Sequence, residues 1–103
     1  MKLLTKDIIN KATKQYELGS DMDQQVVAKF FNPCGRGTWY LMNMDSENNY
    51  CWGLCYICEW EIGSFSLKEL EGVLLPFGLK IERDSFFKPI KAAKLWNQLT
   101  KEV

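Results

Sequence analysis

Apolar residues recur every three to four positions near both ends of the chain, which is the spacing of a helix that buries one face. In residues 5–18 these positions are Ile8, Ile9, Ala12 and Tyr16. In residues 91–100 they are Ala92, Leu95, Trp96 and Leu99. Thr5 has a side chain suited to an N-cap, and Gly19 follows as a stop signal. The pattern therefore predicts an N-terminal helix and a C-terminal helix.

Between these helices the chain is rich in aromatic and β-branched residues, which favour strands. We predict strands over residues 25–31, 38–44 and 50–57. Residues 59–65 predict a fourth strand or a bent extension of the third, because no Gly or Pro separates the two. The segments 32–37 and 45–49 have the composition of turns, and the second is typical of a hairpin. Residues 79–83 are predicted to be extended.

A short middle helix is predicted where Ser66 stands three residues before Glu69, since this is the spacing of a capping box. Gly72 and Pro76 limit its length. The elements together predict an α+β fold, with a small antiparallel sheet of three to five strands packed by an N-terminal helix, a short middle helix and a C-terminal helix. At 103 residues, the chain has room for one globular domain, over residues 1–103.

Charge is balanced overall but unevenly distributed. The 13 basic and 13 acidic residues cancel, so no net field draws the chain to nucleic acid or to an anionic membrane. Residues 39–75 contain one basic and six acidic residues, whereas residues 1–38 contain six and four, and residues 76–103 contain six and three. Such blocks indicate ion pairing within the molecule or a bipolar surface that orients a partner.

The N-terminal sequence enters a polar helical pattern directly and lacks the apolar core of a signal peptide. No window approaches the length of apolar sequence that spans a bilayer. We therefore expect a cytoplasmic protein whose four cysteines are thiols, and no membrane partner.

The absence of histidine removes the commonest general base and the commonest nitrogen ligand of metals. Cys51 and Cys55 lie at an even separation in an apolar strand, so they share one face and Cys58 points to the other. Packing explains them better than zinc ligation. The spacing of Cys55 and Cys58 matches a redox motif without the helix N-terminus that lowers a thiol pKa. We expect no metal and no cofactor, and a redox role of these thiols is left open.

Aromatic residues gather on the central strands and occupy both alternating faces. They are Trp39, Tyr40, Tyr50, Trp52, Tyr56 and Trp60. Either helices cover both faces of the sheet, or one face presents an aromatic binding surface. Core packing is the simpler interpretation. If a face is open, Trp39, Tyr40 and Trp52 are candidates for an interaction surface.

The remaining candidates are carboxylates, namely Glu59, Glu61, Glu82 and Asp84. Glu59 and Glu61 share a face of an extended segment, which suits acid–base chemistry or a hard cation. Glu82 and Asp84 flank Arg83, so we expect an ion-pair arrangement there, with Phe86 or Phe87 anchoring the chain beside it. Whether this run is functional or structural is left open, and no residue is assigned a catalytic role.

Several phrases spread over the chain carry a family resemblance. They comprise Met1, Lys2, Leu3, Leu4 and Thr5; Lys29, Phe30 and Phe31; Thr38, Trp39 and Tyr40; Gly53 and Leu54; Glu59, Glu61, Gly63, Phe65, Ser66, Leu67, Glu69, Leu70 and Glu71; and Gly78, Leu79, Ile81, Glu82, Arg83, Asp84, Phe87, Lys88 and Pro89. The chain thereby resembles the small bacterial family called domain of unknown function 2958. The resemblance covers almost the whole chain.

Two departures from the family pattern bear on chemistry. Asn43 stands where the family commonly has an acidic residue, and this weakens a carboxylate-centred enzyme. Residues 55–58 replace a glycine-containing apolar and acidic stretch. Because the family manages without cysteines there, the resemblance argues further against zinc.

The resemblance implies a cytoplasmic accessory protein of mobile DNA without an established activity. With the missing histidine and the aromatic surplus, it leads us to expect a non-enzymatic module whose partner is another protein, such as a host defence or DNA-processing component. One alternative is nucleic-acid binding through terminal lysines, which are Lys2, Lys6, Lys11, Lys14, Lys88, Lys91 and Lys94. The other is a carboxylate-based, metal-dependent enzyme that uses Glu59, Glu61, Glu82 and Asp84.

Overall fold

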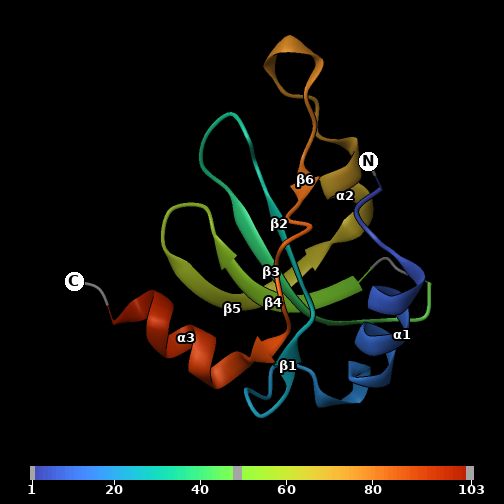
Figure 1. Ribbon diagram of the computed structural model, residues 1–103, viewed down its shortest axis with the longest axis vertical. Helices are drawn as coiled ribbons and strands as arrows, with labels where there is room; N and C mark the ends of the chain where they lie inside the picture. Colours follow the sequence, from blue (N-terminus) through green and yellow to red (C-terminus); the bar gives the residue numbers. More distant parts are fainter. Residues whose placement is uncertain (1, 48–49, 102–103) are drawn as a thin grey trace.

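The computed structural model describes residues 2–47 and 50–101 and shows two sheets (Figure 1). The main sheet is antiparallel, with the strand order β5-β4-β3-β2-β6. Its strands are β2 (Ala28–Phe31), β3 (Thr38–Met44), β4 (Tyr50–Tyr56), β5 (Trp60–Ser66) and β6 (Glu82–Arg83). A second pair joins β1 (Gln25–Val26) to β7 (Ile90–Lys91).

In the described part of the chain, three α-helices pack on the main sheet, and two of them begin at predicted caps. They are α1 (Lys6–Lys14), α2 (Leu67–Gly72) and α3 (Ala92–Thr100). The Thr5 hydroxyl accepts the Ile8 N–H at 3.2 Å, and the Ser66 hydroxyl accepts the Glu69 N–H at 3.3 Å. The predicted α+β class, with an antiparallel sheet packed by three helices, is confirmed.

Helices cover both faces of the main sheet, so the aromatic residues are divided between two cores. The first core lies under α1 and α2 and includes Phe30, Trp39, Leu41, Met44, Cys51, Leu67 and Leu70. The second lies under α3 and includes Val26, Tyr40, Met42, Leu54, Ala92 and Leu95. Trp39 and Tyr40 are 9% and 7% exposed, so packing is their main role.

The strand predicted over residues 25–31 is two strands in different sheets, so that prediction was wrong. Val26 pairs with Ile90 of β7, whereas Ala28 pairs with Leu41 of β3. Val27 lies between them, and its N–H donates to the Leu41 carbonyl at 2.8 Å. No Gly or Pro signals the break, because it is imposed by β7, a partner far along the chain.

The segment after β4 is a separate fourth strand, which settles the alternative of a bent extension. β4 and β5 pair continuously from Tyr50 opposite Ser66 to Tyr56 opposite Trp60. Residues 57–59 make the turn between them without Gly or Pro. We predicted that Cys58 lies on a strand and points to its other face. That prediction was wrong, because Cys58 is an exposed residue of this turn.

Other boundaries differ by one or a few residues. The first helix ends at Lys14, and Tyr16 lies in a separate 3₁₀ turn, η1 (Tyr16–Leu18), where it is partly exposed. The last helix begins at Ala92, because Lys91 pairs in β7. Within residues 79–83, only Glu82–Arg83 pairs as a strand. Of the predicted turn 45–49, residues 48–49 lie outside the described residues.

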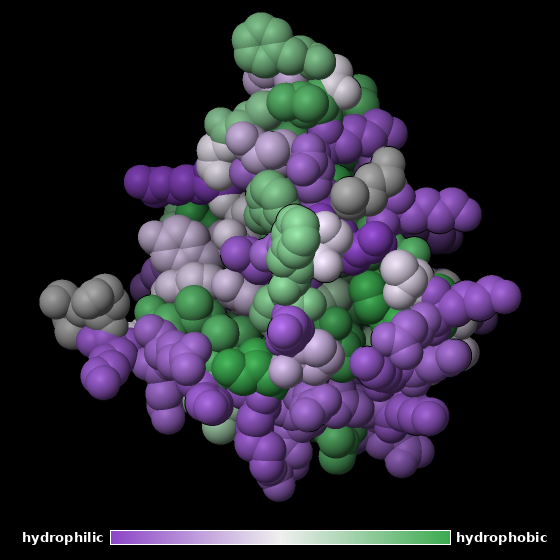
Figure 2. Space-filling model, in the orientation of Figure 1, coloured by the Kyte–Doolittle hydropathy of each residue, from purple (hydrophilic) through white to green (hydrophobic). Residues whose placement is uncertain are grey.

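The loop between α2 and β6 projects from one end of the molecule, at the top of Figure 1. Figure 2 shows hydrophobic residues gathered at that end. Phe77, in the 3₁₀ turn η2 (Pro76–Gly78), is 97% exposed and has a φ of 63°, a left-handed conformation that glycine adopts more readily. The Leu75 N–H donates to the Leu79 carbonyl at 2.9 Å, so the base of this turn is hydrogen-bonded.

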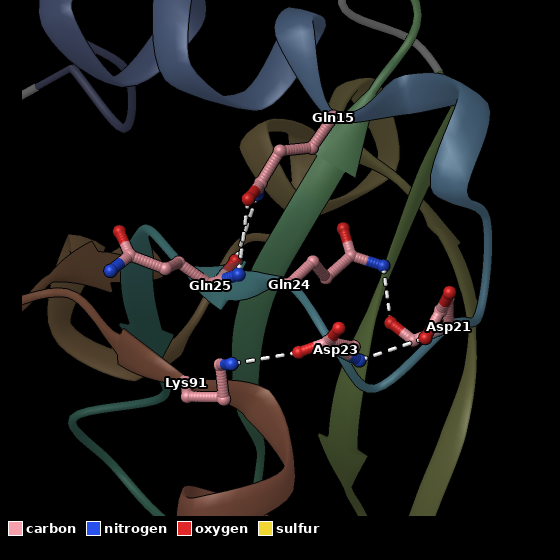
Figure 3. A network of polar contacts seen from close by, with 6 residues as sticks. All are labelled: Gln15, Asp21, Asp23, Gln24, Gln25 and Lys91. Atoms are coloured by element: carbon pink, nitrogen blue, oxygen red, sulfur yellow. Dashed lines mark hydrogen bonds and ion pairs between the residues drawn. The ribbon is translucent and has the colours of Figure 1, made fainter.

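A network of glutamine side chains, partly buried, ties the turn after α1 to β1 and β3 (Figure 3), and the Ala92 N–H at the start of α3 donates to the Gln24 carbonyl. The Gln15 side chain donates to the carbonyls of Gln25 and Met42 at 2.9 and 2.8 Å. Gln24, which is 4% exposed, donates to the Gly19 and Asp21 carbonyls. Lys91 pairs with Asp23 at 2.7 Å on the surface beside this network. The contacts fix the position of β1 and, with β7, the start of α3.

Candidate functional site

A groove of about 340 Å³ lies between the β4–β5 hairpin and α2, on the face of the sheet that α1 and α2 cover. Its apolar lining comes from Trp39, Cys55, Ile57, Phe65 and Leu70. Trp39 and Leu70 are buried, whereas Ile57 in the hairpin turn is 55% exposed. The groove therefore has an apolar floor and an apolar residue at its mouth, which are features of binding sites.

Three carboxylates border this groove, and none of the described residues that line it is basic. Glu61 lies on β5, Glu59 in the preceding turn and Glu69 on α2, and all three are exposed. Within residues 2–47 and 50–101, none of them forms an ion pair. The groove thus presents uncompensated negative charge beside apolar surface, which favours a cationic ligand and disfavours phosphate.

Gly63 opens the floor of the groove, because an added Cβ there would meet nothing within 4 Å. Gly63 lies on β5, which is the first strand in the sheet order and pairs with β4 alone among the described residues. The groove therefore adjoins a sheet edge whose outward-pointing backbone N–H and C=O groups have no strand partner among the described residues.

The other aromatic candidates lie on the opposite face of the sheet. Tyr40 stacks at tilted angles on Trp60 and Phe87, at centroid distances of 5.8 and 5.7 Å. The Lys29 ammonium lies 5.7 Å from the centre of the Tyr40 ring. Burial, followed by the charge of Asp84, raises the pKa of Tyr40. Trp52 packs against the same core, so the predicted set Trp39, Tyr40 and Trp52 is split between two faces.

The charged run on β6 does not form the arrangement we expected. The Arg83 guanidinium donates to the Lys2 carbonyl at 2.7 Å, and the described residues show no ion pair of Arg83 with Glu82 or Asp84. Asp84 instead lies 3.9 Å from the Lys29 ammonium. Of the two expected anchors, Phe87 packs into the second core, whereas Phe86 is 90% exposed. The run therefore ties Lys2 and β2 to the sheet edge.

The four carboxylates of the enzyme alternative lie at opposite edges of the sheet. Glu59 and Glu61 are at β5, and Glu82 and Asp84 are at β6, with three strands between. At about 4.8 Å per strand the edges are roughly 19 Å apart. Among the described residues, no three His, Cys, Asp or Glu side chains come together as metal ligands. The structure brings together Trp39, Glu59 and Glu61, and it separates them from Glu82, Arg83 and Asp84.

The lysines of the nucleic-acid alternative are also separated. Those of α1 and α3 belong to helices on opposite faces of the sheet. Lys11 and Lys91 are engaged with Asp7 and Asp23 at 3.1 and 2.7 Å. The terminal segments therefore do not build one continuous basic surface from these two helices.

The cysteines differ in burial. Cys51 is fully buried, Cys55 is partly buried in the groove lining, and Cys34 and Cys58 are exposed. Burial, with a smaller effect of Asp45, raises the pKa of Cys51 to about 12. Burial, followed by the charge of Glu61, raises the pKa of Cys55 to about 11. The thiolate is the reactive form, so both groups are protected from alkylation and disulfide exchange.

We predict that two thiols react rapidly with a chromogenic disulfide reagent in the native protein at pH 8, and two slowly. At this pH a thiol with a pKa of about 11 is ionised in roughly one molecule in a thousand. Cys34→Ser and Cys58→Ser should each remove one rapid equivalent, whereas Cys51→Ser should remove none. Four equivalents that react together without denaturant would contradict the placement of Cys51 and Cys55.

Sequence reasoning missed part of this groove. Glu69 was interpreted only as a capping residue, and Phe65, Leu70 and Gly63 as parts of a strand and a helix. The two-residue period of a strand could have indicated part of the groove, because it places Glu61, Gly63 and Phe65 on one face of β5. The proximity of α2 to that face could not be read from spacing.

Comparison with known proteins identifies a family and no individual relative. The family model described as "Protein of unknown function (DUF2958)" matches residues 2–103, so the family resemblance seen in the sequence is confirmed. Neither the curated proteins nor the solved structures gave a match. None of the helices in the described part of the chain has the length and apolar character needed to cross a membrane.

Proposed function

The chain belongs to the DUF2958 family of proteins of unknown function, and we propose that it acts as a non-enzymatic protein-interaction module. The groove bordered by Glu59, Glu61 and Glu69 is its binding site. The observation that carries this proposal is an apolar groove, with Ile57 exposed at its mouth, beside carboxylates that lack ion-pair partners among the described residues. A partner segment with basic and apolar side chains fits such a groove.

The biological setting implied by the family resemblance belongs to the same proposal. We expect an accessory protein of bacterial mobile elements that acts in the cytoplasm on a host defence or DNA-processing protein. The four cysteines are free thiols, which agrees with the expected compartment. The acidic groove agrees with a partner of basic character, which is common among proteins that handle DNA.

Tryptophan fluorescence can test the charge preference of the groove, because Trp39 lines it. We expect a capped octapeptide of four lysines and four valines to change the emission, and its glutamate–valine counterpart to leave it unchanged. The combined variant Glu59→Gln, Glu61→Gln and Glu69→Gln should lower the affinity for the lysine peptide about tenfold at low salt. Each exposed ion pair that it removes contributes about 0.2–1 kcal/mol.

A matched control removes the same charge elsewhere. Glu17 and Glu47 are exposed, Glu82 is partly exposed at the opposite edge of the sheet, and none of the three lines the groove. Their combined change to glutamine should leave the affinity within about twofold, because screening limits the reach of surface charges to roughly 10 Å. Equal weakening by both triple variants would contradict the proposal. Tight binding of a single-stranded oligonucleotide with no binding of the lysine peptide would favour the nucleic-acid alternative instead.

A further inference from the structure

The outer edge of β5 lacks the lysine, proline and bulge that commonly guard an edge strand, and its one charged residue is Glu61. β5 has seven residues, contains no Lys or Pro, and pairs with β4 without a register shift. No described strand pairs with its other side. Edge strands of soluble proteins are commonly guarded by lysine, proline or a bulge, because the unpaired N–H and C=O groups are a template for another strand.

The two faces of β5 have different chemistry. Glu61 and Phe65 lie opposite Cys55 and Cys51, and so face the groove together with Gly63. Trp60 and Ile62 lie opposite Tyr56 and Leu54 and face the second core. Ile62 is 38% exposed, so this apolar surface is open at the edge. A strand placed beside β5 would have alternate side chains near carboxylates and near apolar groups.

We infer that the edge of β5 binds an extended segment of a partner protein as a sixth strand, with basic residues on the groove side alternating with apolar residues on the side of Ile62. The inference rests on the proposed function and specifies its binding mode. Main-chain hydrogen bonds supply affinity in such strand addition, and the alternating side chains supply specificity.

A second copy of this chain is a poorer occupant of the edge. Pairing of two β5 strands about a two-fold axis would bring two sets of Glu59, Glu61 and Glu69 to one interface. These carboxylates lack basic partners among the described residues, so like charges would face each other without compensation. A basic segment neutralises them, and charge complementarity therefore selects a partner of different sequence.

Three octapeptides with the same number of lysine and valine side chains distinguish strand addition from simple charge attraction. The first probe is a capped octapeptide that alternates lysine and valine. The second has four lysines followed by four valines, and the third is the alternating peptide methylated at every backbone nitrogen. We expect the alternating peptide to bind at least about tenfold more tightly than either of the others, because only it combines the side-chain period of a strand with free N–H donors. Equal binding of the methylated peptide would overturn the inference.

Hydrogen exchange of the peptide complex locates the added strand. The alternating peptide at saturation should slow exchange of alternate amides of β5 about tenfold or more, while amides of α3 should be unaffected. Protection confined to α2 would overturn strand addition. Failure of the alternating peptide to bind at millimolar concentration would do the same.

A pair of variants with the same added charge completes the test. Ile62→Lys puts a lysine at an exposed position of the edge and should lower the affinity for the alternating peptide at least about fivefold. Leu74→Lys, at a position that is 81% exposed in the projecting loop, should leave the affinity within about twofold.

The experiments distinguish failure of the proposed binding site from failure of the proposed binding mode. If the glutamine variants of the groove weaken binding but the methylated peptide binds as well as its parent, the groove is the site and strand addition is wrong.

Discussion

Replacing Gly53 by alanine is expected to abolish the folded state or to lower the free energy of unfolding by at least about 4 kcal/mol. A Cβ at Gly53 would overlap the Tyr40 carbonyl oxygen and lie 3.0 Å from the carbonyl carbon, on the neighbouring strand β3. These are backbone atoms that cannot rotate away. β3 and β4 would have to separate at the centre of the sheet, close to the bulge between Leu41 and Asn43.

The control for this prediction is the same substitution at Gly63, which lies directly opposite Gly53 in register. A Cβ at Gly63 would meet nothing within 4 Å. Gly63→Ala should therefore change the stability by less than about 1 kcal/mol, with the lower chain entropy of alanine acting in its favour. Urea denaturation followed by circular dichroism measures both variants. Equal midpoints for Gly53→Ala and Gly63→Ala would show that the close approach of β3 and β4 is wrong.

Asn43→Asp is expected to lower the free energy of unfolding at pH 7 by about 3–5 kcal/mol, as for a buried charge left without a partner. Asn43 is fully buried, and its Nδ2 donates to the Gly19 carbonyl and to Gln24 Oε1, both at 2.9 Å. A carboxylate would face two acceptors there. Gln24 cannot turn to donate without losing its own bonds to the Gly19 and Asp21 carbonyls. The Asn43 Oδ1 has no hydrogen-bond partner among the described residues. The aspartate oxygen at that position would therefore also have no donor among them.

The loss of unfolding free energy in Asn43→Asp should become larger as pH rises. Burial and the facing acceptors raise the folded-state pKa of an aspartate at this position above its unfolded value of about 3.9. Between these two values the folded state binds more protons, so the stability of the variant relative to the parent falls as pH rises. Urea midpoints at several values from pH 4 to pH 8 test this. Asn10→Asp, at an exposed position of α1, should show little change. A loss at Asn43→Asp that is constant over this range would contradict the buried network.

Local sequence signals determined the elements that form from nearest neighbours. The β3 strand was predicted with its observed bounds, because strand-forming residues run from a Gly-containing turn to a polar one. The Thr5 and Ser66 caps were equally local, since each needs only a side-chain oxygen and an N–H three residues on. The family could be recognised for the same reason, because its signature is a linear pattern.

Partners distant in sequence decided what local signals left open. The break at Val27 exists because β1 pairs with β7 and β2 with β3. Arg83 stands between two acidic residues, yet its guanidinium bonds the Lys2 carbonyl. Neither result follows from spacing, since each depends on where the two ends of the chain meet the sheet.

The candidate site shows the same division. Composition alone identified an acidic middle block and an aromatic surplus, and alternation placed Glu61 and Phe65 on one face. Only the tertiary structure separated Glu61 from Glu82, brought Glu69 of α2 to the groove and left β5 at the edge. Side-chain period is a property of the local backbone, whereas strand order and helix placement are set by long-range burial of apolar surface.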